Sequence, residues 1–254
     1  MARVGAKKTA GIVVGGLALV AAVGAVGVIG VTAIISSISF EAPSLGDGAA
    51  DRVPQETSAT PVAAPDDDAW ITAVADETGI PERALVAYVA ADAYARAELD
   101  CEVGWNTLAG IGWVESHHGT LPGGSIDADG VARPEIRGIP LDGTNDTMEV
   151  ADTDNGELDG DPTWDRAVGP MQFIPETWSI WAVDGSGNGA PNPHNIDDAA
   201  ATAARYLCRL DGTLGSEEAW VRAVRSYNDT FDYQVRVASA AERYANDAVS
   251  MTNR

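Results

Sequence analysis

The chain has 254 residues, with 38 acidic and 16 basic side chains and a formal net charge of −22. This length is sufficient for one domain with an extension and a core of ordinary size. A strongly negative surface repels nucleic acid and anionic lipid headgroups, so nucleic acid is excluded as the expected partner, whereas calcium and other cationic ligands remain compatible with it.

The N-terminal residues predict a membrane anchor. Arg3, Lys7 and Lys8 precede an uncharged run over 9–40, which is longer than the roughly 20 apolar residues that a bilayer core requires. By the positive-inside rule, residues 1–8 lie in the cytoplasm and the remainder of a single-pass cell-membrane protein lies outside. A cleaved secretory signal is the alternative, and a buried core helix is disfavoured because no polar periodicity interrupts the run.

The rest of the chain predicts a linker followed by a mainly α domain. Residues 41–67 are rich in Ala, Pro, Ser, Thr and Asp, which indicates a flexible linker ahead of a domain over 68–254. Pro81 suits a first helical turn, and Gly119 is the expected left-handed stop of a second helix. No run alternates like a strand, and the expected helices cover 81–99, 105–117, 175–182, 197–210, 216–226 and 233–248.

Residues 121–165 predict a long insertion rich in Gly, Asp and Pro. A disordered loop is the alternative, and five apolar residues favour order: Ile136, Ile139, Leu141, Met148 and Trp164. Its acidic segment over 152–161 is a weak candidate for a second cation site, because its spacing provides no complete ligand set.

The two cysteines, Cys101 and Cys208, lie outside the membrane on this topology, where disulfides persist. We therefore expect them to pair, and two separately buried thiols are the alternative. Closing a loop of about 100 residues contributes on the order of 4 to 5 kcal/mol in the chain-entropy model.

Glu115 is the leading catalytic candidate. Leu108, Ile111, Gly112 and Glu115 share one face of the helix expected over 105–117, so the carboxyl extends an apolar stripe. Desolvation raises the pKa of such a carboxyl towards the range in which it donates a proton at neutral pH. Glycoside cleavage requires that proton on the departing oxygen, although a buried glutamate is also compatible with a purely structural role.

Three motifs occur in order along the chain: Glu115 to Gly119, Gly169 to Pro175, and Ser226 to Asn228. Together they resemble the three signatures of lytic murein transglycosylases, and the stretch over 164–206 is most similar to the membrane-bound B type. The resemblance covers roughly residues 80 to 248 apart from the insertion. It implies a lysozyme-like, mainly α fold behind the N-terminal transmembrane helix.

The resemblance also implies roles for individual residues. Glu115 matches the acid/base and Ser116 a neighbour that lines the cleft. The residues that match sugar-binding positions are Gln172, Tyr206, Tyr227, Asn228 and Tyr233. Tyrosine rings suit a glycan because their faces stack on sugars while their hydroxyls form hydrogen bonds, although tyrosines that belong to a protein core are the commoner case. The third motif departs from the family at Ser226 and at 229–230, which puts substrate preference in doubt.

No matching motif supplies a second carboxylate, which a retaining glycosidase ordinarily uses as its nucleophile. The resemblance implies that the N-acetyl group of muramic acid assists cleavage, and that Glu115 then deprotonates the 6-hydroxyl to form a 1,6-anhydro end. Peptidoglycan strands are the expected partner, with cell-wall synthesis or division proteins as further partners. A hydrolytic muramidase and a catalytically weak wall-binding module are the alternatives.

Residues 184–189 carry oxygen side chains at the alternating positions of a calcium loop, with glycine at the sixth position. The resemblance to the B type implies a longer loop in which Asp198 is the last carboxylate. The expected ligands of a structural calcium ion are Asp184, Ser186, Asn188, Ala190 and Asp198. A plain Gly-rich turn is the alternative, and no organic cofactor is expected.

Overall fold

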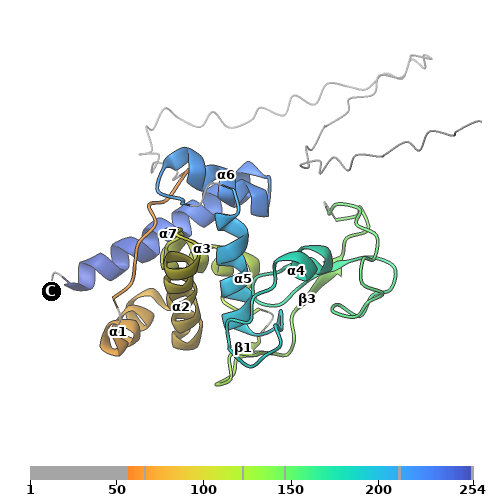
Figure 1. Ribbon diagram of the computed structural model, residues 1–254, viewed down its shortest axis with the longest axis horizontal. Helices are drawn as coiled ribbons and strands as arrows, with labels where there is room; N and C mark the ends of the chain where they lie inside the picture. Colours follow the sequence, from red (N-terminus) through yellow and green to blue (C-terminus); the bar gives the residue numbers. More distant parts are fainter. Residues whose placement is uncertain (1–56, 66, 122, 146, 211–212, 253–254) are drawn as a thin grey trace, which may run out of the picture. The chain divides into compact units, whose positions relative to one another are not determined.

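The computed structural model describes residues 57–65, 67–121, 123–145, 147–210 and 213–252. The described residues are mainly helical, as predicted (Figure 1). The helices are α1 (Asp68–Thr78), α2 (Glu82–Glu98), α3 (Trp105–Ser116), α4 (Pro175–Trp181), α5 (Ile196–Cys208), α6 (Glu217–Tyr227) and α7 (Phe231–Thr252). Four short strands accompany them: β1 (Ser125–Ile126), β2 (Ala132–Arg133), β3 (Arg137–Pro140) and β4 (Arg166–Val168).

The strands contradict the expectation that the domain has none. They form two antiparallel pairs, β1 with β2 and β3 with β4. Each strand has only two to four residues, which is too few for an alternating pattern of apolar and polar residues to be recognisable in the sequence.

The helix starts follow from local capping chemistry. The side chains of Asp67, Asn195 and Ser216 accept hydrogen bonds from backbone N–H groups in the first turns of α1, α5 and α6. Pro175 occupies the first turn of α4, where its missing N–H has no cost. These local signals explain why most predicted helix boundaries lie within a few residues of those in the structure.

Helix α3 packs between α2 and α7, and α5 packs mainly against α2, with smaller contacts to α3, α4 and α6. Two glycines permit this packing. A Cβ added at Gly110 would lie 2.8 Å from the carbonyl oxygen of Val237 in α7, and one at Gly112 would clash with the hydroxyl of Tyr88 in α2. The close approach of α3 to α7 depends on the missing side chain of Gly110, and that of α3 to α2 depends on the missing side chain of Gly112. The packing brings the C-terminal end of α3 to the N-terminal part of α7.

Residues 57–65, which the sequence assigns to the linker, contact the helices. Ala59 is buried. The backbone N–H of Thr60 donates to Glu242 at 2.8 Å, and the backbone N–H of Val62 donates to Asn106 at 2.8 Å. These residues are therefore part of the folded unit that begins near residue 55.

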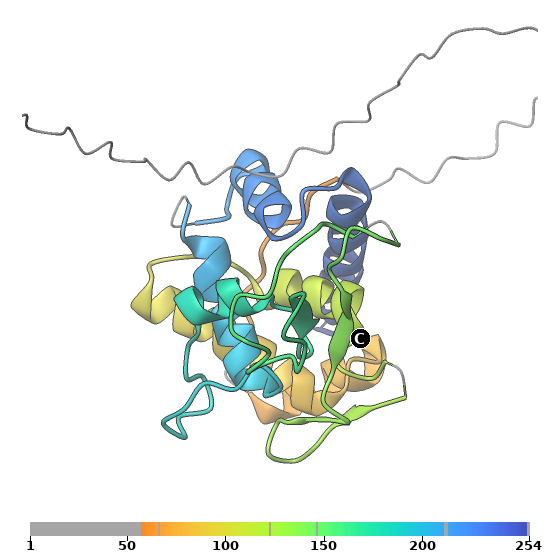
Figure 2. The same cartoon turned by 90° about the vertical axis from the view of Figure 1, so that its right-hand side faces the viewer.

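The insertion has a defined structure in its described residues. Its part from β3 onwards lies beside α4, on the side away from α1, and its earlier part, with β1, lies near one end of α5 (Figures 1 and 2). The proposed apolar anchors are only partly correct, because Ile139 and Met148 are exposed. Backbone hydrogen bonds hold the segment instead. Val150 donates to the carbonyl oxygen of Leu141 at 2.8 Å, and Asp165 donates to that of Val150 at 3.1 Å.

Cys101 and Cys208 form the predicted disulfide, with their Cα atoms 6.1 Å apart. The bond joins the segment between α2 and α3 to the last residue of α5 across a sequence separation of 107.

The described helices include none that combines the length and the apolar character needed to cross a membrane. The predicted anchor over 9–40 lies outside the described residues.

Candidate active site

Glu115 lies in the last turn of α3, and the chain turns sharply after it. His117, His118 and Gly119 all have positive φ, and His117 rather than the expected Gly119 caps the helix. The ring of His117 stacks on that of Trp113, with centroids 3.9 Å apart. This contact stabilises a left-handed conformation that is unfavourable for a residue with a side chain. Glu115 keeps part of its surface exposed, so it is accessible to a ligand.

The environment of Glu115 suits proton transfer. Burial by the surrounding protein raises the pKa of its carboxyl to about 7, and this effect outweighs the opposing hydrogen bond from Tyr233 and the positive charge of Arg236. The hydroxyl of Tyr233 donates to Oε1 of Glu115 at 2.6 Å. Because Oε1 accepts this bond, the proton of the neutral acid is expected on Oε2.

Ser116 does not line a cleft, contrary to the prediction. It is buried, and its hydroxyl donates to the carbonyl oxygen of Pro170 at 2.6 Å. The hydroxyl oxygen of Ser116 also accepts from the N–H of Gly119 at 2.7 Å. Ser116 therefore joins the end of α3 to the second motif. The reason is the helical register, because the residue after Glu115 points about 100° away from it.

Gln172 is part-exposed and adopts a left-handed backbone with φ 49°. Its side-chain amide donates to the carbonyl oxygen of Gly169 at 2.8 Å, which fixes the side chain over the turn of the second motif. A non-glycine residue in this conformation is strained, and such strain is concentrated at functional sites. The hydrogen bond leaves the amide oxygen of Gln172 without a partner within its own turn.

The three predicted tyrosines come from α5, α6 and α7 and converge with the second motif. The hydroxyl of Tyr206 donates to the carbonyl oxygen of Ser226 at 2.8 Å, and that of Tyr227 donates to the carbonyl oxygen of Met171 at 2.7 Å. The rings of Tyr227 and Tyr233 are parallel with centroids 6.4 Å apart, and Tyr206 meets Tyr227 edge-on. Of the three hydroxyls, only that of Tyr233 contacts the acid.

The third motif is held through Ser226, the residue that departs from the family pattern. Arg209 stacks on the ring of Tyr206, with its guanidinium carbon 3.5 Å from the centroid, and donates to the hydroxyl of Ser226 at 3.0 Å. Asn228 is exposed at the end of α6, and its side-chain oxygen accepts from Thr230. Within the described part of the chain, the hydrogen bonds of Asn228 do not extend to Glu115.

The prediction missed two features beside Glu115. Arg236 lies one helical turn after Tyr233 and acts electrostatically on the acid, and the helical spacing alone was a sufficient signal to find it. The second is a buried polar chain in which Tyr88 bonds Nδ1 of His118 and Tyr244 bonds Nε2. Burial lowers the pKa of His118 to about 3, so the ring stays neutral and acts as a structural support beneath α3.

The predicted calcium loop closes on its two carboxylates. Asp184 accepts hydrogen bonds from the N–H groups of Asn188 and Gly189, at 3.1 and 2.8 Å. Asp198 is fully buried and accepts from the N–H groups of Ser186 and Asn192, at 2.8 and 2.9 Å. The loop therefore folds around its first and last predicted ligands. The donors in these four hydrogen bonds are all neutral backbone N–H groups.

Residues 146–253 match the family model for the transglycosylase SLT domain. The match contains the second and third motifs and begins after Glu115, which the fold brings to Tyr233 from outside the matched segment. It also includes the last part of the insertion, which the resemblance was expected to leave out. Comparison with curated proteins and with solved structures gave no match.

Proposed function

We propose that this chain, whose residues 146–253 match the transglycosylase SLT domain, is a lytic transglycosylase that cleaves the β-1,4 bond between MurNAc and GlcNAc in peptidoglycan. The domain indicates a transglycosylase acting on peptidoglycan in general. The observation that supports a specific reaction is the contact in which the hydroxyl of Tyr233, from the matched segment, donates to Oε1 of Glu115 at 2.6 Å. Burial also raises the pKa of this partly exposed carboxyl to about 7, which suits proton transfer better than a purely structural role.

In the proposed reaction, Glu115 serves first as the acid and then as the base. Its Oε2 proton passes to the glycosidic oxygen as the C1–O bond breaks and the N-acetyl oxygen of MurNAc bonds to C1, while Tyr233 holds Oε1. The resulting carboxylate then accepts the proton of the 6-hydroxyl of MurNAc as that oxygen bonds to C1 and the bond from C1 to the N-acetyl oxygen breaks. Glu115 ends protonated, the sugar ends as the 1,6-anhydro form, and no water is consumed.

The surroundings of Glu115 favour this route over a carboxylate nucleophile. The side chains that shift the pKa of Glu115 are Tyr233 and Arg236, and no second carboxylate of the described residues is among them. A retaining glycosidase places its nucleophile about 5 Å from the acid, where it would act strongly on that pKa. The N-acetyl group of the substrate is therefore the proposed internal partner, as the family resemblance implies.

Mass spectrometry of the fragments released from purified sacculi tests the product. We expect muropeptides that end in 1,6-anhydro-MurNAc, because the 6-hydroxyl of the same sugar, and not water, bonds to C1 after the leaving sugar has departed. Fragments heavier by one water, with reducing ends, would identify a hydrolytic muramidase. Sacculi that bind the protein without release of any fragment would favour the wall-binding module.

We further propose that the run over 9–40 anchors the chain in the cell membrane with the domain outside. The Cys101–Cys208 disulfide supports an oxidising compartment, because such bonds do not persist in the cytosol. The proposed partners are peptidoglycan strands and, through the anchor, proteins of cell-wall synthesis or division. Detection of the mature N-terminus by mass spectrometry distinguishes this anchor from a cleaved signal.

We also propose that the loop over 184–198 binds a structural calcium ion. The loop fits the ion because buried Asp198 accepts hydrogen bonds from neutral N–H groups, and an oxygen-rich site on neutral donors suits a hard cation. Asp184, Ser186, Asn188, the carbonyl of Ala190 and Asp198 would hold it. The ion would brace the loop between α4 and α5 and would take no part in bond cleavage.

Calorimetry and thermal melting test this loop. Calcium at about ten times its Kd adds roughly 1.4 kcal/mol by linkage, so chelation should lower the melting temperature of the wild type. Asp184→Ala should bind one fewer calcium ion per chain than the wild type does. An unchanged stoichiometry in this variant would show that the loop is only a Gly-rich turn.

A further inference from the structure

Four side chains from the ends of α4 and α5 form a cluster of aromatic rings and positive charges. The two helices pack against each other (Figure 1). Trp181 is the last residue of α4, Arg205 and Tyr206 lie near the end of α5, and Arg209 caps α5. The guanidinium carbon of Arg209 lies 3.5 Å from the ring centroid of Tyr206 and 5.8 Å from that of Trp181. That of Arg205 lies 5.6 Å from the Trp181 centroid. We call these four residues the Trp181–Arg209 cluster.

The Trp181–Arg209 cluster continues a row of rings that begins at the candidate acid. Tyr233, whose hydroxyl donates to Glu115, lies parallel to Tyr227 with the ring centroids 6.4 Å apart. Tyr227 meets Tyr206 at 5.7 Å, and Tyr206 meets Trp181 at 5.9 Å, both edge-on. Trp181, Tyr206 and Tyr227 each keep part of their surface exposed. A long ligand that contacts Glu115 can therefore also reach the indole ring.

The arginines of the cluster differ from most others in having no acidic partner. Each of seven arginines lies within 4.0 Å of a carboxylate: Arg83, Arg96, Arg133, Arg137, Arg166, Arg225 and Arg236. No carboxylate of the described residues pairs in this way with Arg205 or Arg209. The whole chain has 38 acidic and only 16 basic side chains. Two neighbouring arginines without an acid therefore give this end of the row a local attraction for anions.

Arg209 has one edge of its guanidinium open. Its Nη1 donates to the carbonyl oxygen of Tyr206 at 2.5 Å and to the hydroxyl of Ser226 at 3.0 Å. Within the described part of the chain, Nε and Nη2 have no acceptor, and neither is one of the buried atoms that lack a partner. These two atoms form an edge that can bind a carboxylate through two parallel hydrogen bonds.

The surroundings of Arg209 prepare it for such a ligand. Stacking on Tyr206 and the two bonds of Nη1 hold the guanidinium in place, so less side-chain freedom is lost on binding. Burial also lowers the pKa of Arg209. A partly desolvated cation attracts an anion more strongly than one that is surrounded by water.

We propose that the Trp181–Arg209 cluster is a subsite of the glycan cleft, in which Arg209 binds a carboxylate carried by muramic acid while Trp181 stacks on a sugar ring. A peptide-free muramic acid supplies this carboxylate from its lactyl group, and a substituted one supplies it from its peptide. GlcNAc carries none. The guanidinium fork matches the planar carboxylate, and the indole face suits a sugar. This inference rests on the proposed function, because the row of rings joins the subsite to Glu115.

Calorimetric binding to the full-length Glu115→Gln protein tests the subsite, because this protein should leave its ligands uncut. The probes are three tetrasaccharides: a peptidoglycan fragment with peptides, the same fragment without them, and a neutral tetramer of GlcNAc. Adding Arg209→Gln should weaken binding of an anionic fragment by roughly 10- to 100-fold and leave the neutral tetramer unchanged. Loss for the peptide-bearing fragment alone identifies the peptide carboxylate, and loss for the peptide-free fragment identifies the lactyl group.

Arg133→Gln is the matched control, because Arg133 is an exposed arginine in β2 and its loss should leave the binding of all three ligands unchanged. The proposal is overturned if Arg209→Gln binds the anionic fragments as tightly as its parent does. It is equally overturned if the variant weakens all three ligands alike, since Arg209 then only supports the cleft.

A change in the ligand keeps the test open if circular dichroism shows that Arg209→Gln is misfolded. Conversion of the carboxyl groups of the fragments to amides should weaken their binding to the Glu115→Gln protein by about 10-fold, and equal binding would overturn the subsite. Glycans that bind without this discrimination contradict the subsite alone. If neither the anionic fragments nor the neutral tetramer binds, the proposed function fails together with the subsite.

Discussion

Glu115→Gln should reduce the rate of glycan cleavage by roughly 10²- to 10⁴-fold, because the amide can neither donate the proton to the leaving oxygen nor accept it from the 6-hydroxyl. Release of soluble fragments from sacculi measures this rate. Glu98→Gln is the matched control, since Glu98 is an exposed residue at the end of α2. Comparable turnover of Glu115→Gln and the wild type would contradict the assignment of the acid/base.

The same variant separates a catalytic from a structural role through its stability. The pKa of Glu115 is about 7 in the folded protein, against the ordinary glutamate value of 4.5 that applies to the unfolded chain, so the folded state binds more protons between these values. The wild type therefore loses the stability that protonated Glu115 contributes as pH rises from about 4.5 through 7. Glu115→Gln does not undergo this loss. The variant should be more stable at pH 8, by at most about 3 kcal/mol.

At a pH below about 4 the two proteins should melt alike, because Glu115 is then protonated in both the folded and the unfolded states. Thermal melting at pH 8 and below about pH 4 checks whether the variant is the more stable protein only at the higher pH. If Glu115 mainly supported the fold, the variant would melt lower than the wild type at pH 8. The wild-type rate should also fall as pH rises above about 7, since the acid form of Glu115 is then lost.

Removal of the disulfide should lower the free energy of unfolding by about 4 to 5 kcal/mol, because the bond closes a loop with a sequence separation of 107. The Cys101→Ala, Cys208→Ala double variant should show this in thermal melting or in denaturant titration. For a domain of this size, the melting temperature should fall by roughly 10 to 20 °C.

Reduction supplies the control for this variant. A thiol reductant should lower the melting temperature of the wild type to a similar extent and should leave the double variant unchanged, since no bond remains to be reduced. Alkylation of the unreduced wild type should label neither cysteine. Two labelled thiols per chain would contradict the pairing.

The helices and the candidate acid could be predicted from local sequence signals. Helix positions follow from apolar spacing and from capping residues such as Ser216 and Pro175, which act over a few residues. Glu115 stood out because it extends an apolar helical face, so its desolvation followed from spacing alone. The disulfide was predictable because only one pairing of two cysteines exists.

Which side chains meet depends on the packing of distant segments. Tyr233 reaches Glu115 across 118 residues because Gly110 lets α7 approach α3, and no local pattern encodes that crossing. Ser116 points away from Glu115 because of the helical register, but its contact with Pro170, 54 residues away, depends on the packing of the second motif against the end of α3. Ser116, the residue next to the acid, thus has a structural role and not the predicted role in lining the cleft.

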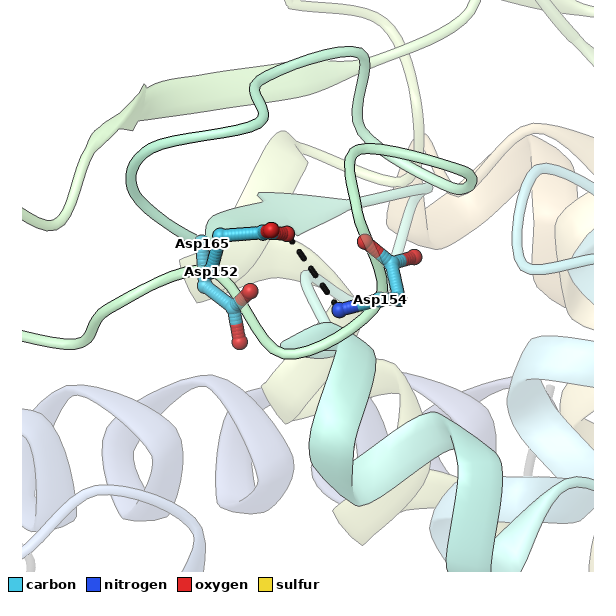
Figure 3. Close-up of side chains that lie close together, drawn as sticks. All are labelled: Asp152, Asp154 and Asp165. Carbon is cyan, nitrogen blue, oxygen red and sulfur yellow. Dashed lines mark hydrogen bonds between the residues drawn. The ribbon is translucent and has the colours of Figure 1, made fainter.

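The insertion shows the same limit. The acidic segment over 152–161 lacks a complete ligand set in the sequence, and the structure brings a carboxylate oxygen of Asp165, which lies beyond the segment, within 4.8 Å of oxygens of Asp152 and Asp154 (Figure 3). Exposed Ile139 and Met148 failed as anchors because backbone hydrogen bonds and carboxylates that accept from backbone N–H groups order this segment in place of apolar burial. Hydrophobic periodicity in the sequence indicates which residues are buried. It gives no information where polar contacts between distant residues determine the structure.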